Sequence, residues 1–549
     1  MRSLSTSRFL VHAAILAVAG LLLWSMRWMG PSDVVAAEPP GRYIVVYQAP
    51  EQIDRNVLKG HGHRVKSDFG EAGVMVINTA DVSDLRNLPG VAGVALDVPG
   101  VGVPRDEIVI PMKSASNLPT GCGDTHHSCG LQWDLDRIHV PRAWKTTKGS
   151  SHVRVAVLDS GLRSTHEEVG HNYDIVHSFS TVQPNPDCAA DDSTFSNIED
   201  LSGHGTWIST HVAGRNGSLM TGIAPDVTLI NGRVLSACGF GYHSWILDAM
   251  FKANEKGAQI ENISLGGYVC ADGVVKGSVY CGAKVNVGDG PTIWRAYRHM
   301  VDYLRRRGTL VIAAAGNEHV RLDQDGRVIS AGSLAFRSAS SDPANDLRGL
   351  SEVPGGVPGV IAVASVNRVT GRGTDGETLY GQYGVHARDQ LTYYSSYGDR
   401  IDVSAPGGAR FFNIPVFDCQ DARCGALGPI NTSDNSAAFG AWAFDPLGDP
   451  CDNCYVFTQG TSMAAPQVSG VAALALAASW SLTTDNLAKL LLQSVSSFSD
   501  DNATPPIASK PASPWYNFDV DYSGKAIHNQ LMGTGVIDAA QAVMGEPGH

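Results

Sequence analysis

The chain has 549 residues, of which 43% are hydrophobic and 17% are charged, and its formal net charge is −13. These values describe an ordinary folded globular protein and exclude a disordered or membrane-embedded chain. The acidic balance, with no basic cluster beyond the short run Arg305–Arg307, also argues against nucleic acid as a partner.

The N-terminus has the parts of an export signal. Arg2 and Arg8 precede an apolar stretch at about 9–26, and small residues suited to cleavage follow at 35–37. The apolar stretch is shorter than the roughly 20 residues that a transmembrane helix prefers, so a retained anchor is the lesser alternative. We therefore expect a signal peptide at 1–37, a secreted or periplasmic protein, and no stable membrane span after signal removal.

Residues 38–100 have the pattern of a small α+β module. The strand-like runs RYIVVYQ, GVMVINTA and VAGVALDV alternate with helical stretches and form two strand–helix–strand units, which predicts a ferredoxin-like fold. The stretch 101–130 that follows contains Pro, Gly and Ser. It is predicted to be an exposed linker, where a protease can cleave.

Between residues 131 and 545, apolar strand runs alternate with helices. The expected strands lie near 153–158, 227–231, 260–264, 309–315 and 359–366. The expected helices lie near 204–214, 243–256, 292–307, 463–479 and 484–496. This alternation predicts an α/β fold with a parallel sheet covered by helices on both faces. Surface insertions are expected at 268–290, 318–350, 368–392 and 409–456.

Three short motifs in this region carry groups that suit one reaction. Asp159 ends a strand run in VAVLDSG, His204 stands in GHGT, and Ser462 opens a helical run in GTSMAAP. A serine hydroxyl becomes a nucleophile when an imidazole takes its proton, and a buried carboxylate fixes the tautomer of that imidazole. Singly, the three residues could be a strand end, a packed histidine and a helix N-cap. Together they predict a serine peptidase.

The three motifs, in this order, resemble those of the subtilisin-like (S8) family, and the resemblance spans about 131–543. It implies hydrolysis of peptide bonds in proteins or peptides through a Ser462 acyl-enzyme, without a cofactor for catalysis. It assigns the oxyanion donor to Asn317 in TLVIAAAGNE. It also implies that the substrate backbone lies as an added strand beside one glycine-rich segment. The residues expected to contact substrate are Ser264, Leu265, Gly266, Ala314 and Gly316.

The resemblance extends to the regions around the peptidase domain. Residues 38–100 resemble the inhibitor-type propeptide of this family, which implies an intramolecular inhibitor and folding aid; a permanent accessory domain is the alternative. Family members often hold structural calcium at a loop after the histidine helix. Here that loop, 215–221, is altered, and its expected partners are Gln132 and Glu168.

One departure from the family pattern produces a second candidate base. The family motif HGTHVAG appears here as HGTWISTHVAG, so His211 competes with His204. His204 is favoured because glycines flank it on both sides and because its spacing to GIAP at 222–225 matches the family. His211 lies two helical turns further on and is expected to be a packed helix residue.

Ten cysteines agree with an oxidising destination. Pairing of near neighbours would join Cys122 with Cys129, Cys188 with Cys238, Cys270 with Cys281, Cys419 with Cys424, and Cys451 with Cys454. The alternative for the last four cysteines is a zinc site, because paired short spacings also suit tetrahedral thiolate ligands. The export signal favours disulfides.

Two other classes of function are compatible with parts of the sequence. A catalytically idle secreted binding protein could use the same scaffold, although all four expected catalytic residues are intact. An α/β-hydrolase esterase requires Gly two residues after its nucleophile, and Ala464 occupies that position after Ser462.

Overall fold

The computed structural model describes residues 41–102, 110–111, 132–184, 188, 197–215, 219–271, 289–329, 347–368, 389–392, 394–408, 438–445, 447–496 and 533–545. The signal peptide expected at 1–37 and most of the linker expected at 101–130 lie outside these ranges. The same is true of much of the four expected insertions.

The N-terminal module is an antiparallel four-stranded sheet with two helices. Its strands lie in the order β2-β3-β1-β4. The elements are β1 Gly41–Tyr47, α2 Arg55–Gly60, β2 Arg64–Phe69, β3 Val74–Thr79, α3 Val82–Arg86 and β4 Val91–Leu96, with short 3-10 turns at Pro50–Gln52 and Gly70–Ala72. This arrangement confirms the predicted α+β fold.

Both faces of β1, at the centre of this small sheet, are buried, which explains its unbroken apolar run. Side chains alternate between the two faces of a strand. Tyr43 and Val45 pack with Leu58 and Leu85 of the module's own helices. Ile44 instead belongs to a core cluster that includes residues of the peptidase region's helices. The module therefore completes its packing only against the rest of the protein.

A ten-stranded sheet forms the centre of the peptidase region, with the order β22-β23-β19-β16-β13-β11-β7-β9-β8 and β17 attached to β16. Its strands are β7 Arg154–Asp159, β8 Phe179–Ser180, β9 Thr228–Arg233, β11 Ile260–Ile263, β13 Leu310–Ala314, β16 Ile361–Arg368, β17 Asp389–Leu391, β19 Val403–Pro406, β22 Val495–Ser496 and β23 Val536–Ile537. The central pairs are parallel. The predicted parallel sheet is confirmed.

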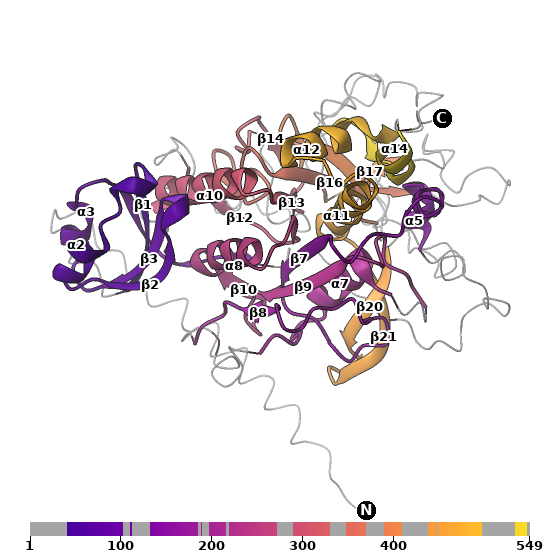
Figure 1. The fold of residues 1–549 in the computed structure, drawn as a ribbon, viewed down its shortest axis with the longest axis horizontal. Coiled ribbons are helices and arrows are strands. Elements are labelled where there is room, and N and C mark those ends of the chain that lie inside the picture. Colours follow the sequence, from indigo (N-terminus) through magenta and orange to yellow (C-terminus); the bar gives the residue numbers. More distant parts are fainter. Residues whose placement is uncertain are drawn as a thin grey trace, which may run out of the picture. The chain divides into compact units, whose positions relative to one another are not determined.

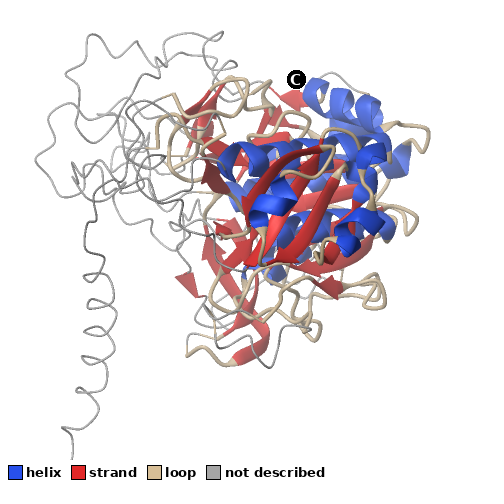
Figure 2. Ribbon diagram, turned by 90° about the vertical axis from the view of Figure 1, so that its left-hand side faces the viewer, coloured by secondary structure: helices blue, strands red, loops and turns tan. Residues whose placement is uncertain are grey.

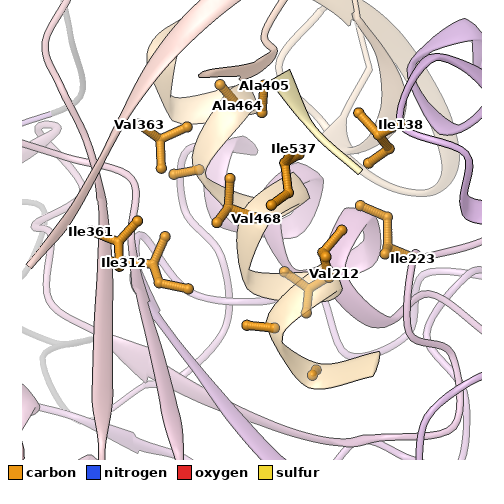
Figure 3. Packing of buried hydrophobic residues seen from close by; sticks show 14 of the residues in the cluster. Ile138, Val212, Ile223, Ile312, Ile361, Val363, Ala405, Ala464, Val468 and Ile537 are labelled. Carbon is orange, nitrogen blue, oxygen red and sulfur yellow. The ribbon is translucent and has the colours of Figure 1, made fainter. Parts of the chain in front are cut away.

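Helices cover both faces of this sheet (Figures 1 and 2). One face carries α7 His204–Ala213, α11 Thr461–Ala478, α12 Thr484–Gln493 and α14 Ala539–Met544, together with α5 Trp133–Arg137 and α6 Val140–Ala143. The other face carries α8 His243–Glu255 and α10 Asp289–Arg306. Figure 3 shows Val468 of α11 among Ile312, Val363 and Val212, which come from two strands and a neighbouring helix.

Helix α11 is apolar around its whole circumference because it lies within the core. Among the described residues, it is the one helix with the length and hydropathy of a membrane span, and 89% of that window is buried inside the fold. It begins at Thr461, two residues earlier than predicted, with Gly460 as its N-cap. Ser462 is thus the second helical residue and not the cap.

Short strand pairs border the large sheet. They are β5 Pro99–Gly102 with β10 Phe240–Tyr242, β12 Gly267–Val269 with β15 Ser351–Val353, β14 Arg321–Leu322 with β18 Tyr397–Gly398, and the ribbon β20 Ala438–Phe444, β21 Pro450–Thr458 and β6 Ile110–Pro111. The β20–β21 hairpin packs on α7, and Phe439 and Tyr455 are buried in it. This part of the segment expected to be a surface insertion therefore has its own small core.

Two disulfides lie within the described residues, Cys188–Cys238 and Cys451–Cys454. Both are pairs that sequence proximity predicted. The zinc alternative is wrong for Cys451 and Cys454, since their sulfurs bond to each other. Cys270 is also disulfide-bonded. The remaining expected pairs involve cysteines outside the described ranges.

Candidate active site

Asp159 and His204 form a buried hydrogen-bonded pair. Asp159 is the last residue of β7, at the carboxyl end of a parallel strand, where ligands bind in sheets of this class. His204 is the first residue of α7, and its Nδ1 lies 2.7 Å from Asp159 Oδ1. Both side chains are at most 1% exposed. The carboxylate therefore fixes the orientation of the imidazole in a site protected from water.

The glycines on either side of His204 are required by close contacts. Gly203 has φ 97°, in the left-handed region that favours glycine, and an added Cβ would lie 2.2 Å from the Trp442 ring. An added Cβ on Gly205 would lie 2.2 Å from the carbonyl oxygen of Gly161. The GHG motif is thus what allows the histidine to begin a helix that is packed between a hairpin and the turn after β7.

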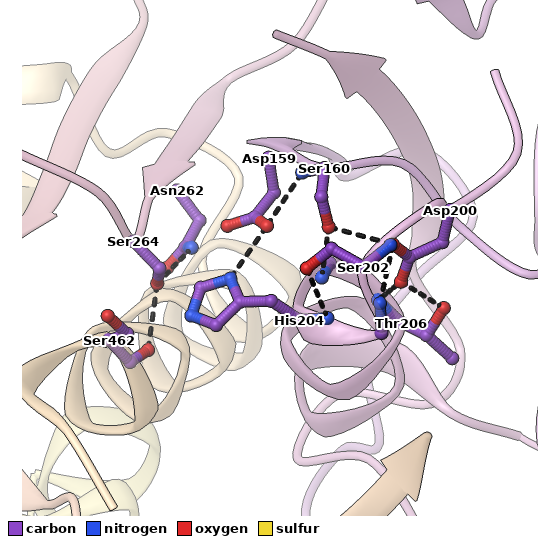
Figure 4. Close-up of polar contacts among 11 residues, drawn as sticks. Asp159, Ser160, Asp200, Ser202, His204, Thr206, Asn262, Ser264 and Ser462 are labelled. Carbon is purple, nitrogen blue, oxygen red and sulfur yellow. Dashed lines mark hydrogen bonds and ion pairs between the residues drawn. The ribbon is translucent and has the colours of Figure 1, made fainter. Parts of the chain in front are cut away.

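Asp200 organises the start of this helix, and the sequence analysis missed it. Because the N-cap Gly203 has no side chain, the acceptor for the first helical N–H groups must come from elsewhere. Asp200 is 3% exposed. At 2.6–2.9 Å, its carboxylate accepts hydrogen bonds from Ser160 Oγ, from the N–H groups of Ser202 and Gly203, and from the N–H and hydroxyl of Thr206 (Figure 4). An acid shortly before a glycine-capped helix was the available signal.

Ser462 is held through its backbone. Its carbonyl oxygen accepts a hydrogen bond from Ser264 Oγ at 2.8 Å, and Asn262 Nδ2 donates to that same hydroxyl at 2.9 Å. The Ser264 side chain, which we expected at the substrate, therefore contacts the nucleophile's own main chain. Figure 4 shows the His204 ring between the side chains of Asp159 and Ser462.

Within the described residues, Ser462 Oγ is buried and makes no hydrogen bond. The structure thus brings His204 and Asp159 into contact but leaves the serine–histidine hydrogen bond unformed. Such catalytic hydrogen bonds are often long without substrate and shorten in the complex.

The Asn317 side chain contacts Thr461, the first residue of the nucleophile helix α11. Its Oδ1 accepts hydrogen bonds from the N–H and the hydroxyl of Thr461 at 2.9 and 2.7 Å. These contacts set the orientation of the amide. Asn317 Nδ2 is buried, and no group in the described part of the chain accepts from it. A donor is therefore available next to Ser462.

A strand of the protein itself lies in the segment expected to bind substrate. β5 pairs antiparallel with β10, and Gly102 forms an antiparallel bridge with Gly266. The Gly102 N–H donates to the Gly266 carbonyl at 3.2 Å. Leu265 is fully buried, and Ala314 ends β13 shortly before Gly316. The edge expected to take a substrate strand is thus contacted by the end of β5, through the Gly102–Gly266 bridge.

The rival histidine, His211, is fully buried in a second polar cluster. Its Nε2 lies 2.5 Å from Asp134 Oδ2 and 2.8 Å from Gln467 Nε2, and its ring stacks on Trp207 with centroids 4.2 Å apart. Burial opposes ionisation of Asp134, but His211 and Gln467 hold the pKa of that carboxyl below its ordinary value. His211 therefore links α5, α7 and α11 inside the core.

The residues expected to hold calcium are engaged in other contacts. Gln132 Oε1 accepts the N–H of Thr221 at 2.9 Å, and Glu168 Oε1 accepts the N–H groups of Leu219 and Met220 at 2.6 and 2.9 Å. Oxygens that face backbone donors do not suit a cation. As arranged here, these side chains do not fit a calcium ligand set, and calcium binding stays a prediction.

The fold and this site define an α/β protein with an Asp–His pair facing a helix-borne serine, which is the arrangement of a serine peptidase. The Subtilase family (Peptidase S8) matches residues 150–535. The chain belongs to the subtilase family and is a subtilisin-like serine peptidase, whose substrates are proteins or peptides.

Known members of the family are distant in sequence. The chain is 25% identical to Subtilisin NAT of Bacillus subtilis subsp. natto over 425 residues, which are 77% of this chain and 75% of that protein. It is 23% identical to the epidermin leader peptide-processing serine protease of Staphylococcus epidermidis over 375 residues, 66% and 68% of the two chains. A solved structure of the Staphylococcus aureus epidermin leader peptide-processing protease matches with TM-score 0.61 at 19% identity, covering 93% of this chain and 100% of that one. This likeness shows the shared fold.

Proposed function

We propose that the protein is an exported endopeptidase that cleaves peptide bonds through an acyl-enzyme on Ser462. The observation that carries the proposal is the buried contact of 2.7 Å between His204 Nδ1 and Asp159 Oδ1. His204 is the first residue of α7, and its imidazole faces Ser462 (Figure 4). In this scheme Asp159 holds the imidazole with Nε2 directed at the serine and stabilises the imidazolium.

The chemical steps follow from the positions of these groups. Ser462 Oγ attacks the substrate carbonyl carbon while His204 Nε2 takes the hydroxyl proton. The resulting oxyanion accepts hydrogen bonds from Asn317 Nδ2 and from the Ser462 N–H, at the positive end of the α11 dipole. His204 then returns the proton to the departing amine. Water attacks the acyl-enzyme with His204 as base, which releases the carboxylic acid product. None of these steps uses a cofactor.

We further propose that residues 38–100 are a propeptide that inhibits the enzyme until it is removed. β5 at the end of this module lies between β10 and Gly266, where a substrate strand would pair. Asp97 supports its position: it is 6% exposed, and its Oδ1 accepts the N–H of Ser244 at the start of α8 at 3.0 Å. Arg42 pairs with the same carboxylate at 2.5 Å.

Export rests on the signal-like N-terminus and is supported by the disulfides. Arg2, Arg8 and the apolar stretch at about 9–26 are features of a cleaved signal. Disulfides such as Cys188–Cys238 persist in oxidising compartments. A catalytically idle scaffold is the alternative to the enzyme, and a maturation experiment separates the two.

Ser462→Ala should accumulate as a precursor that lacks only the signal peptide. The wild-type protein should lose a further roughly sixty to ninety residues by self-cleavage at the exposed linker. Mass spectrometry and N-terminal sequencing of the purified proteins would measure both. Ser479→Ala, a matched change at an exposed position just after the same helix, should mature normally. Normal processing of purified Ser462→Ala without added protease would refute self-cleavage.

A further inference from the structure

Two carboxylates and a phenol gather behind the glycines that border the substrate. A Cβ added to Gly266 would lie 2.6 Å from Glu352 Oε1. A Cβ added to Gly316 would lie 2.8 Å from Glu318 Oε2 and 3.1 Å from the Tyr268 hydroxyl. Because glycine has no side chain, neither Gly266 nor Gly316 places one between the substrate strand and these acidic groups.

The strand pair β12–β15 holds the cluster together. Tyr268 and Glu352 are directly opposite in its antiparallel register, so their side chains lie on the same face. The Tyr268 hydroxyl donates to Glu318 Oε2 at 2.6 Å. Glu318 directly follows Asn317, the expected oxyanion donor. The cluster is therefore fixed to the same two segments that border the scissile carbonyl.

Glu352 is buried, and only one of its two carboxyl oxygens has a hydrogen-bond partner in the part of the chain that the structure describes. It is 1% exposed, its Oε2 accepts the N–H of Gly356, and its Oε1 has no hydrogen-bond partner in the described residues. Arg400, the cation whose charge acts on it, instead donates to the carbonyl groups of Gly356, Val357 and Val360 and pairs with Asp402. A buried acid in this state costs stability, and a ligand that completes its hydrogen bonds would remove that cost.

A cationic side chain of the substrate can supply this partner. If Asn317 and Ser462 bind the scissile carbonyl as proposed above, the substrate residue that provides this carbonyl lies between the Gly266 and Gly316 segments. Its side chain then faces Glu352, whose Oε1 would lie 2.6 Å from a Cβ on Gly266. We propose that Glu352, supported by Glu318, makes this enzyme select lysine or arginine at that substrate position, P1. This proposal rests on the peptidase function proposed above. An acid in the P1-binding region of a peptidase produces this selectivity through a desolvated ion pair.

The ionisation of Glu352 makes the selectivity depend on pH. The titratable groups that interact electrostatically with Glu352 are Glu318, Arg400, Tyr268 and Tyr297. Burial raises its pKa to about 8, Glu318 adds to the rise, and Arg400 opposes it. Burial keeps both tyrosines neutral by raising their pKa values. A bound cation favours the ionised carboxylate. The preference for a basic side chain should therefore rise with pH and level off once Glu352 is already ionised in the free enzyme.

The test compares two peptides that differ only at P1, where one has lysine and the other has norleucine, its uncharged analogue. The mature wild-type protein should show a kcat/KM for the lysine peptide about tenfold to a hundredfold higher, since a charged hydrogen bond in a buried site has that effect. In Glu352→Gln, which keeps an acceptor for the Gly356 N–H but has no charge, the ratio should fall to about one or below. Glu255→Gln, the same change at an exposed position on α8, should keep the wild-type ratio.

The same ratio can be measured in the wild-type protein from about pH 6 to pH 9. This test does not depend on the folding of a variant. The ratio should rise toward a plateau near the raised pKa of Glu352, and His204 ionisation cancels because it affects both peptides alike. A flat profile, a preference for norleucine, or an unchanged ratio in Glu352→Gln would each overturn the proposal. Cleavage of the norleucine peptide without any preference for lysine would reject only the selectivity, whereas no cleavage of either peptide would reject the peptidase function as well.

Discussion

Replacing Asp159 with Asn is expected to lower kcat by about 10⁴-fold and to leave KM within a few fold. The reason is the hydrogen bond from His204 Nδ1 to Asp159 Oδ1 at 2.7 Å, which keeps the proton on Nδ1 and leaves Nε2 as the acceptor for the serine proton. An amide at this position no longer favours that tautomer and does not stabilise the imidazolium. Steady-state kinetics on a peptide substrate would measure the change.

The matched control is Asp134→Asn, which changes the buried Asp–His pair of His211, the second histidine on α7. Asp134 contacts His211 and Gln467 in the core, so its replacement should lower the free energy of unfolding by about 3–5 kcal/mol. The folded fraction should keep its kcat within a few fold. If Asp134→Asn lost kcat as Asp159→Asn is expected to, and Asp159→Asn did not, His211 and not His204 would be the base.

Asn317→Ala should lower kcat by about a hundred- to a thousandfold and change KM by no more than a few fold. A preorganised donor stabilises developing negative charge, so its loss affects the transition state more than the bound substrate. The buried Nδ2, held in place by two hydrogen bonds from Thr461 to Oδ1, is such a donor. Kinetics and a thermal unfolding curve of the same sample would separate catalysis from folding.

A folded Asn317→Ala protein with nearly full kcat would contradict this assignment. Asn317 would then be a structural residue that accepts a hydrogen bond from the N–H of Thr461, and another group would have to be the oxyanion donor.

The sequence predicted the parts of the fold that depend on local pattern. The mostly apolar run VRVAV predicted β7 because a parallel strand buried on both faces has no polar alternation, and Asp159, two residues after this run, was correctly placed at the strand end. His204 between two glycines indicated close backbone approach, which Trp442 and Gly161 produce. Near-neighbour spacing predicted Cys188–Cys238 and Cys451–Cys454.

The features that sequence reasoning missed depend on contacts between distant segments. The place of Asp200 shortly before a glycine-capped helix indicates a capping acid, but its contact with Ser160, which comes from a distant segment, has no signal in the neighbouring sequence. Glu352 lies behind Gly266 only because β15 pairs with β12. The position of Ser264 was predicted, but the contact of its hydroxyl with Ser462 follows from how the end of β11 meets α11.

Labelling with a fluorophosphonate probe tests the central claim most directly. The hydroxyl of a serine reacts with this electrophile only when a base activates it and nearby donors stabilise the product, so the probe reports the assembled site rather than any single residue. We expect the mature protein to be labelled stoichiometrically and peptide mapping to place the label on Ser462. An intact, folded, mature protein that takes no label, or takes it at a different serine, would contradict the assignment of Ser462 as the nucleophile.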